Sequence, residues 1–147
     1  MERTNGEYLI STDKSKIDIT VIHAFLTQSY WAEGIPIAVV KKSIDHSLCF
    51  GVYRKTMLVG FARVITDFAT FAYLADVFIV PGERGKGLSK WLMELIIAHP
   101  ELQGLRRFTL ATKDAHGLYA KFGFTPFDAP DRWMQIHRPD VYKRNKK

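Results

Sequence analysis

Two glycines and two basic residues follow a strongly apolar stretch of the chain, in the segment Arg84–Ser89 (Arg-Gly-Lys-Gly-Leu-Ser). Glycine at 85 and 87 lets a ligand approach the backbone closely, because no Cβ stands in the way. If a helix begins here, its free N–H groups and the positive end of its dipole add to the charges of Arg84 and Lys86. The segment therefore predicts a phosphate-binding turn.

The spacing of these glycines disfavours two common nucleotide-binding motifs. A Walker P-loop needs four residues between its first glycine and a Gly-Lys-Ser/Thr sequence, and the chain has no such segment. A dinucleotide fingerprint needs a third glycine where Lys90 stands. ATP and NAD are therefore disfavoured, and an ordinary strand-to-helix turn is the alternative for this segment taken by itself.

The apolar segment 70–80 predicts the strand that leads into the turn. Both of its alternating faces are apolar, which is typical of a central strand that is buried on both sides. Asp76 is the only charged residue within it. Pro81 would end the strand, and apolar residues recur at helical spacing from Leu88 onwards.

The remaining elements surround this strand, turn and helix. Ser15-Lys16-Ile17-Asp18 has the spacing of a capping box and predicts a helix that begins near Ser15. Pro36 suits the first turn of a second helix, and Asp114 is expected to cap a short helix over 115–122. Further strands are expected over 48–53, 57–65, 107–112 and 132–137. This order predicts an α+β fold, with a mixed, mostly antiparallel central sheet flanked by helices.

The length and charge of the chain limit its organisation and partners. With 147 residues, it is expected to form a single domain over residues 1–142, followed by a basic, disordered tail over 143–147. The net charge is +6, but four of the last five residues are basic, so the rest of the chain is nearly neutral. Nucleic acid is therefore disfavoured as a partner.

The single cysteine, Cys49, excludes an internal disulfide and a cysteine-based zinc cluster, and no metal is expected. The chain has no apolar run of the roughly 20 residues that a membrane-spanning helix needs, and no secretory signal. We expect a cytoplasmic protein without a membrane partner.

Two motifs together resemble the acyl-CoA signature of the GNAT N-acetyltransferase superfamily. The segment Val80–Ser89 resembles its Gln/Arg-x-x-Gly-x-Gly/Ala pattern. Arg84 and Gly87 match the pattern, and Ser89 stands where glycine or alanine is usual. The segment Leu118–Phe124 resembles the family's Leu-Tyr-x-Lys-x-Gly-Phe, at the family's distance from the first motif. The motifs cover about residues 58–124, and the segment 132–142 resembles the end of small, largely uncharacterised bacterial members.

The resemblance implies the GNAT acyl-CoA N-acyltransferase fold and an enzyme that moves an acetyl group from acetyl-CoA to a primary amine. The amine, on a small molecule or a peptide, would attack directly within a ternary complex. A non-enzymatic acyl-CoA-binding or sensor module on the same fold is the alternative, and a homodimer is left open. The residues that the resemblance places at coenzyme A are Phe78, Ile79, Val80, Arg84, Gly85, Lys86, Gly87, Leu88, Ser89, Asp114, His116 and Lys121.

The resemblance also implies the proton-transfer groups. Tyr119 corresponds to the tyrosine that faces the sulfur as general acid, because a phenol with a pKa of about 10 stays protonated at neutral pH. Packing on the apolar stripe of its helix is the alternative role for Tyr119. Asp76 is the candidate general base, since a partly buried carboxylate suits proton abstraction; alternatively it binds a neighbouring backbone group or basic residue. Asp67 is a weaker candidate for the base.

Three aromatic residues are candidates for the border of the acceptor pocket. Tyr30 and Trp31 follow the first predicted helix, and Trp133 lies in the last predicted strand. Core packing explains these side chains equally well. The sequence does not name the acceptor.

Overall fold

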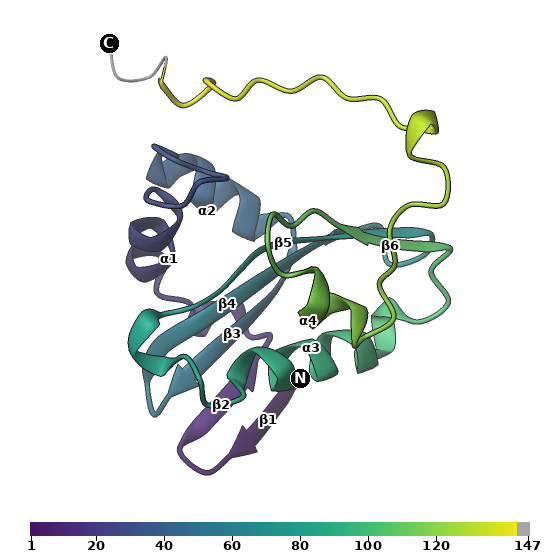
Figure 1. The fold of residues 1–147 in the computed structure, drawn as a ribbon. Coiled ribbons are helices and arrows are strands. Elements are labelled where there is room, and N and C mark those ends of the chain that lie inside the picture. Colours follow the sequence, from purple (N-terminus) through teal and green to yellow (C-terminus); the bar gives the residue numbers. More distant parts are fainter. Residues whose placement is uncertain (144–147) are drawn as a thin grey trace.

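Six strands form one continuous sheet in the computed structural model, which describes residues 1–143. The strands follow one another across the sheet in chain order, and only the last two are parallel (Figure 1). They are β1 (Glu2–Asn5), β2 (Tyr8–Ser11), β3 (Leu48–Arg54), β4 (Met57–Thr66), β5 (Phe71–Ile79) and β6 (Arg107–Leu110). The expected α+β fold with a mixed, mostly antiparallel sheet is confirmed.

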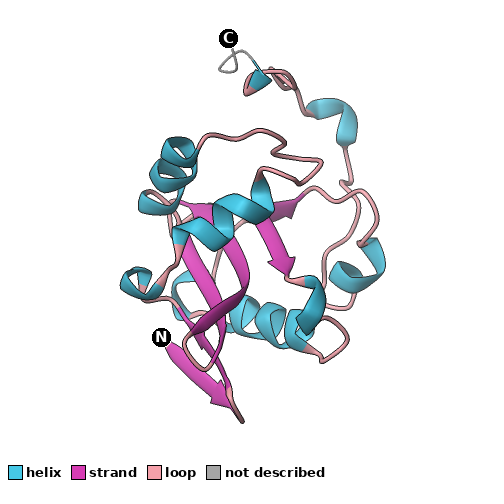
Figure 2. Cartoon of the chain, turned by 90° about the vertical axis from the view of Figure 1, so that its left-hand side faces the viewer, coloured by secondary structure: helices cyan, strands magenta, loops and turns pink. Residues whose placement is uncertain are grey.

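Helices cover both faces of the sheet (Figure 2). The helices α1 (Ile19–Leu26) and α2 (Ile37–Asp45) pack on one face, and α3 (Leu88–Ala98) and α4 (His116–Ala120) pack on the other. Side chains alternate between the two cores along β3, where Phe50 and Val52 face α3 while Cys49 and Tyr53 face α1 and α2. Within residues 1–143, no helix is long and apolar enough to span a bilayer.

Several predicted elements are confirmed by the structure. The segments 48–53 and 57–65 form the antiparallel hairpin of β3 and β4. Pro36 stands at the start of α2 as its N-cap, and α3 begins at Leu88 as expected. The short helix α4 lies within the expected range 115–122, and Gly123 adopts a φ of +95° just after it.

The predicted start of one helix and the predicted cap of another are wrong. Ser15 lies in a short 3₁₀ helix (Lys14–Lys16), and α1 begins later because Asp18 caps it by accepting the N–H of Thr20 at 3.1 Å. Asp114 does not cap α4. The N-cap of α4 is Ala115, the helix has no side-chain cap, and the N–H of Ala115 itself donates to Oγ1 of Thr112 at 3.1 Å.

The expected burial of β5 on both faces is also wrong. β5 is the fifth of six strands, and its neighbour β6 pairs only with its first four residues, Phe71–Leu74. Beyond Leu74, the sheet opens on that side, and Ala75–Val77 are partly exposed. The buried residues of β5 are Ala72, Leu74, Phe78 and Ile79.

The strand predicted over 132–137 does not form. Residues Pro130–Arg132 make a 3₁₀ helix, and 133–138 run on as an exposed, extended segment that pairs with no strand among the described residues. The alternating sequence pattern alone does not supply a neighbour to pair with. Of the tail expected over 143–147, residues 144–147 lie outside the part of the chain that the structure describes.

Candidate functional site

A cavity of about 540 Å³ opens where β5 and β6 diverge, and we call it the splay cavity. Its walls are the second half of β5 (74–77), the segment 110–115 that follows β6, and Tyr119 on α4. The connection between α1 and α2 contributes Tyr30 and Trp31. Strand divergence therefore brings residues from distant parts of the chain around one cavity.

A β-bulge shapes the β5 wall of the splay cavity. Ala75 pairs with Arg63 and Phe78 with Phe61, so Asp76 and Val77 together lie opposite one residue of β4. Asp76 has a φ of +55°, a conformation that aspartate tolerates better than most residues. A bulge leaves one residue outside the regular ladder of hydrogen bonds, so a backbone group is available on this wall.

The carboxylate of Asp76 holds two side chains at the cavity wall. Its Oδ2 atom accepts from Nε of Arg63 at 2.8 Å, and its Oδ1 atom accepts from Nε1 of Trp31 at 2.8 Å. The Arg63 guanidinium also donates to Oγ of Ser47 at 3.2 Å. Only 9% of the Asp76 side chain is exposed. Asp76 therefore binds one neighbouring basic residue, Arg63.

Tyr119 stands between the splay cavity and a second cavity and lines both. Its side chain is 9% exposed, and burial raises the pKa of its hydroxyl above the ordinary value. A raised pKa keeps the phenol protonated at neutral pH. Because Tyr119 lines both cavities, it is available to a bound molecule.

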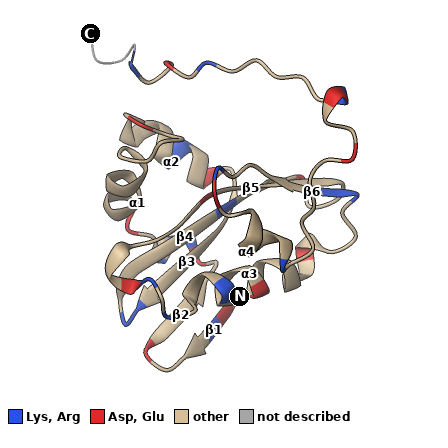
Figure 3. Ribbon diagram, viewed as in Figure 1, with Lys and Arg blue, Asp and Glu red and all other residues tan. Residues whose placement is uncertain are grey.

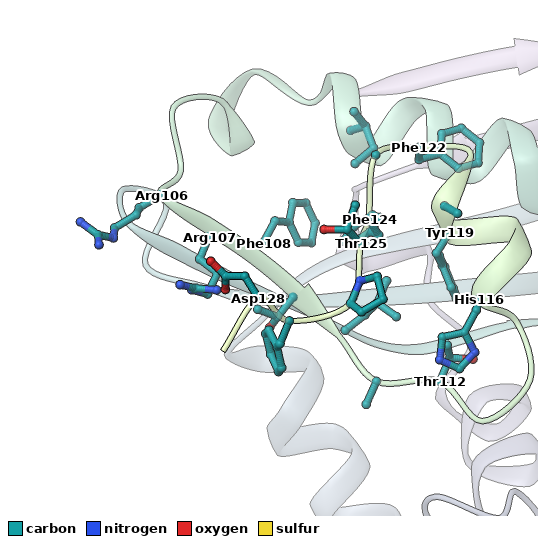
Figure 4. Close-up of a pocket in the computed structure, with 18 residues that line it drawn as sticks. Arg106, Arg107, Phe108, Thr112, His116, Tyr119, Phe122, Phe124, Thr125 and Asp128 are labelled. Carbon is teal, nitrogen blue, oxygen red and sulfur yellow. The ribbon is translucent and has the colours of Figure 1, made fainter. Parts of the chain in front are cut away.

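The second cavity is larger, about 830 Å³, and lies between β6 and the segment 122–128 (Figure 4). His116 lines this second cavity and not the splay cavity, whereas Asp114 lines the splay cavity. Lys121 is exposed just after α4 and lines neither. The structure therefore separates these three predicted coenzyme A contacts.

The predicted phosphate-binding turn precedes α3 with its backbone accessible. Gly85 and Gly87 have φ values of +79° and +78°, and a Cβ at either position would meet no atom within 4 Å. Gly87 is the N-cap of α3 and supplies no side-chain cap, so the first N–H groups of the helix have no partner within it. The exposed Arg84 donates from Nε to the carbonyl of Ile79 at 2.9 Å.

Sequence reasoning missed a nearly buried carboxylate next to this turn. Glu83 is 8% exposed and accepts hydrogen bonds from the Tyr8 hydroxyl at 2.6 Å, from Lys86 at 3.0 Å and from Arg54 at 3.1 Å. The bond from Tyr8, followed by that from Lys86, lowers the pKa of Glu83 to about 2. Figure 3 shows acidic and basic residues side by side between β5 and α3. Lys86 is therefore partly neutralised, while the Arg84 guanidinium joins no ion pair among residues 1–143.

The side chains of the last predicted contacts on β5 point into the core. Phe78 stacks on Phe25 with 4.0 Å between ring centroids, and Ile79 is 5% exposed. The backbone N–H of Val80 donates to the carbonyl of Val59 at 2.9 Å. After the turn, Leu88 is buried in the core as well, whereas Ser89 is half-buried. A ligand on this part of β5 would therefore meet the backbone rather than these side chains.

The three candidate acceptor residues do not share a cavity. Tyr30 and Trp31 line the splay cavity and pack edge to face with centroids 5.1 Å apart. Trp133 lies elsewhere, stacked on Phe127 at 4.6 Å and over the Arg107 guanidinium at 5.1 Å. The sequence reading missed further residues of the splay cavity: Ser43, Arg63, Tyr73, Lys113 and Tyr142. An arginine inside an apolar strand was the one signal that could have identified Arg63.

Two other residues take structural positions. Asp67 accepts the backbone N–H groups of Ala69, Thr70 and Phe71 in the β4–β5 turn, which holds its pKa well below the usual range. Cys49 is buried and lines neither cavity, and burial raises its pKa to about 11. Over residues 1–143, no cluster of three or more histidine, cysteine, aspartate or glutamate side chains could hold a metal ion.

Comparison with known proteins gives a consistent result. The model of the acetyltransferase (GNAT) family matches residues 19–124. An acetyltransferase homologue from Gibberella zeae is 34% identical, and the match covers 80% of this chain and 78% of that protein. The crystal structure of a GNAT-family protein from Xanthomonas campestris pv. campestris is 56% identical, with a TM-score of 0.90 over 92% of this chain and 96% of that one.

A more distant structure shows the fold alone. It is an acetyltransferase-fold protein from Clostridium acetobutylicum solved with acetyl-CoA. Its sequence is 14% identical to this chain, and the TM-score is 0.63 over 93% of this chain and 96% of that one. The same arrangement of helices and strands therefore extends to distant sequences.

Proposed function

The chain belongs to the acetyltransferase (GNAT) family, and we propose that it transfers an acetyl group from acetyl-CoA to a primary amine in a ternary complex. The observation that carries this proposal is the position of Tyr119. This buried tyrosine lines the splay cavity at the divergence of β5 and β6.

The turn at Arg84–Ser89 would bind the pyrophosphate of the donor. Two left-handed glycines, an uncapped helix start and the exposed Arg84 support this assignment. Lys86 contributes less charge than its sequence position suggests, because Glu83 already holds it at 3.0 Å. Main-chain N–H groups and Arg84 would therefore provide most of the attraction for phosphate.

The bulged part of β5 would hold the pantetheine arm and the thioester. The side chains of Phe78 and Ile79 are buried, so the contacts along Phe78–Val80 would come from the backbone. A backbone N–H freed by the bulge at Asp76 and Val77 would polarise the thioester carbonyl, as one donor of an oxyanion hole. Asp114 lies on the opposite wall of the splay cavity, whereas His116 and Lys121 lie outside that cavity.

The chemistry needs one proton donor and one proton acceptor. The neutral amine attacks the thioester carbon and forms a C–N bond, and the tetrahedral intermediate collapses by breaking the C–S bond. The departing thiolate takes the proton of the Tyr119 hydroxyl, whose raised pKa keeps it in the acid form. The amine gives up its proton to Asp76, directly or through water, and the proton returns from solvent to Tyr119.

The acceptor would approach from the side of Tyr30 and Trp31. These two side chains are 61% and 42% exposed and border the splay cavity close to Asp76. Trp133 stands beside the second cavity, so its role as an acceptor contact has no geometric support here. A flat or aliphatic amine, free or on a peptide, would fit an aromatic border of this kind.

Thiol release from acetyl-CoA with a panel of primary amines tests the proposal. At least one amine should release thiol at a saturable rate, and Tyr119→Phe should lower kcat by about 10²-fold. If acetyl-CoA raises the melting temperature while no amine in a broad panel releases thiol, the chain is an acyl-CoA-binding module instead. An unchanged rate in Tyr119→Phe would remove Tyr119 from the mechanism.

A further inference from the structure

The turn at 84–89 has little backbone support at its centre. Lys86 stands between Gly85 and Gly87, and both glycines adopt left-handed conformations. Among residues 1–143, neither Gly85 nor Lys86 makes a backbone–backbone hydrogen bond. Glycine loses more conformational freedom than any other residue when its backbone is fixed. A turn of this kind therefore needs side-chain contacts to keep one shape.

The side chain of Lys86 supplies such contacts. Its Nζ atom donates to Oε1 of Glu83 at 3.0 Å and to the Tyr8 hydroxyl at 3.3 Å, and it lies 6.0 Å from the centre of the Tyr8 ring. Tyr8 belongs to β2, so these contacts join the turn to the N-terminal hairpin of β1 and β2 (Figure 1). The centre of the turn is therefore attached to the sheet through one lysine.

Glu83 connects this lysine to two strands. Its side chain accepts from the Tyr8 hydroxyl of β2 at 2.6 Å and from Arg54 of β3 at 3.1 Å. Arg54 is held in turn by Glu7, which accepts from its Nε atom at 2.8 Å. Glu83 is 8% exposed, whereas the Glu7 side chain is 40% exposed. Loss of the Glu83 carboxylate would therefore leave Lys86 without its charged acceptor.

We propose that Glu83 is a positioning residue that acts through Lys86 and holds the turn at 84–89 in the shape that binds the pyrophosphate of the donor. This inference rests on the proposed function. A binding segment that is already ordered loses less conformational entropy when its ligand arrives, so it binds more tightly. No residue of the turn lines the splay cavity, where the proposed chemistry takes place. Glu83 should therefore affect the affinity for the donor and not the chemical step.

Calorimetric titration of the full chain with acetyl-CoA tests this role without any need for catalysis. Glu83→Gln should raise the Kd for acetyl-CoA about 10-fold, and it should raise the KM for acetyl-CoA by a similar factor while kcat changes little. Tyr8→Phe removes one hydrogen-bond donor to Glu83 and keeps the ring, so it should raise the Kd about threefold. Glu7→Gln is the matched control, because it removes a carboxylate from Arg54 but no contact of Lys86, and it should leave the Kd unchanged.

The direction of the change distinguishes two roles of Glu83. If this carboxylate only neutralised Lys86, Glu83→Gln would free a positive charge at the turn and would tighten the binding of acetyl-CoA. A residue that positions the turn gives the opposite result. Circular dichroism checks that each variant is folded, and if Glu83→Gln does not fold, Tyr8→Phe decides the question by the same titration.

The outcomes for the wild type and the variants are separable. A wild-type chain that binds no acetyl-CoA would contradict the proposed function itself. If the wild type binds acetyl-CoA, a Kd that is equal or lower in folded Glu83→Gln, or one that is unchanged in Tyr8→Phe, would overturn the role of Glu83 alone.

Discussion

The Nε atom of Arg63 on β4 lies 2.8 Å from Oδ2 of Asp76 on the bulge of β5, and 16% and 9% of these side chains are exposed. The pair joins the two strands where their hydrogen-bond ladder is interrupted. It also fixes Trp31 through the second carboxylate oxygen. The same contact therefore contributes to the stability of the sheet and holds the wall of the splay cavity in position.

Asp76→Asn should lower the free energy of unfolding by about 3 kcal/mol, because it leaves the arginine largely buried without a countercharge. Urea denaturation measures this loss. The matched control is Asp45→Asn, which breaks the exposed pair with Lys41 and should cost less than about 0.5 kcal/mol. Equal losses in the two variants would contradict the assignment.

Enzyme kinetics of variants at Asp76 and Arg63 distinguish a catalytic role of Asp76 from a structural one. If the carboxylate accepts the amine proton, Asp76→Asn should lower kcat well beyond the loss in Arg63→Gln, at a temperature where both variants are folded. A purely structural carboxylate would give similar kcat values in the two variants. Such similarity would leave water as the proton acceptor.

The pH dependence of the rate should identify Tyr119. Burial raises the pKa of this phenol, and the mechanism needs its protonated form, so the rate should fall only when the pH rises above about 10. In Tyr119→Phe this alkaline decline should be absent and kcat lower throughout. Tyr53→Phe is the control, because it removes a buried hydroxyl that has no partner among the described residues and lines neither cavity.

Glu83 should make the turn before α3 sensitive to acid. Its pKa is lowered from 4.5 to about 2, so its ionised form stabilises the fold above pH 4.5 and loses this effect as the pH falls toward 2. Glu83→Gln should therefore show a smaller drop in melting temperature between pH 6 and acid than the wild type. Glu94→Gln, an exposed change on α3, should retain the full drop. A Glu83→Gln profile parallel to that of the wild type would show that Glu83 does not contribute.

Cys49 should be chemically inert in the folded chain. Its thiol is 1% exposed, and burial raises its pKa to about 11, so very little reactive thiolate is present near neutral pH. Ellman's reagent should react slowly with the native chain and quickly after unfolding in guanidinium chloride. Rapid native labelling, or loss of thiol release in Cys49→Ala, would reopen an acyl-cysteine mechanism.

Local sequence patterns were sufficient to predict those elements that contain an alternation of apolar residues, a turn or a helix start of their own. The hairpin of β3 and β4 and the start of α3 at Leu88 were predictable from neighbouring residues. The hairpin of β1 and β2 was missed, although Asn5-Gly6 is a strong turn signal. The start of α1 was misplaced because both Ser15 and Asp18 are residue types that cap helices, and Asp18 caps α1 in the structure.

Features that depend on contacts between strands were not predictable. Arg63 and Asp76 are 13 positions apart and meet only because of the register of β4 and β5. The bulge has no pattern of its own in the sequence. In the same way, the alternation over 132–137 predicted a strand, but whether such a segment pairs depends on a neighbour elsewhere.

The glycine turn and the aromatic mouth of the splay cavity lie on different segments of the chain, so their sequences can change independently. The turn at 84–89 follows β5 after a short 3₁₀ helix (Pro81–Glu83), whereas Tyr30 and Trp31 stand on the connection between α1 and α2. Insertions or substitutions in that connection can reshape the mouth of the splay cavity without moving the strand register or the glycine turn. Under the proposed function, the same donor-binding turn is therefore compatible with many different acceptors.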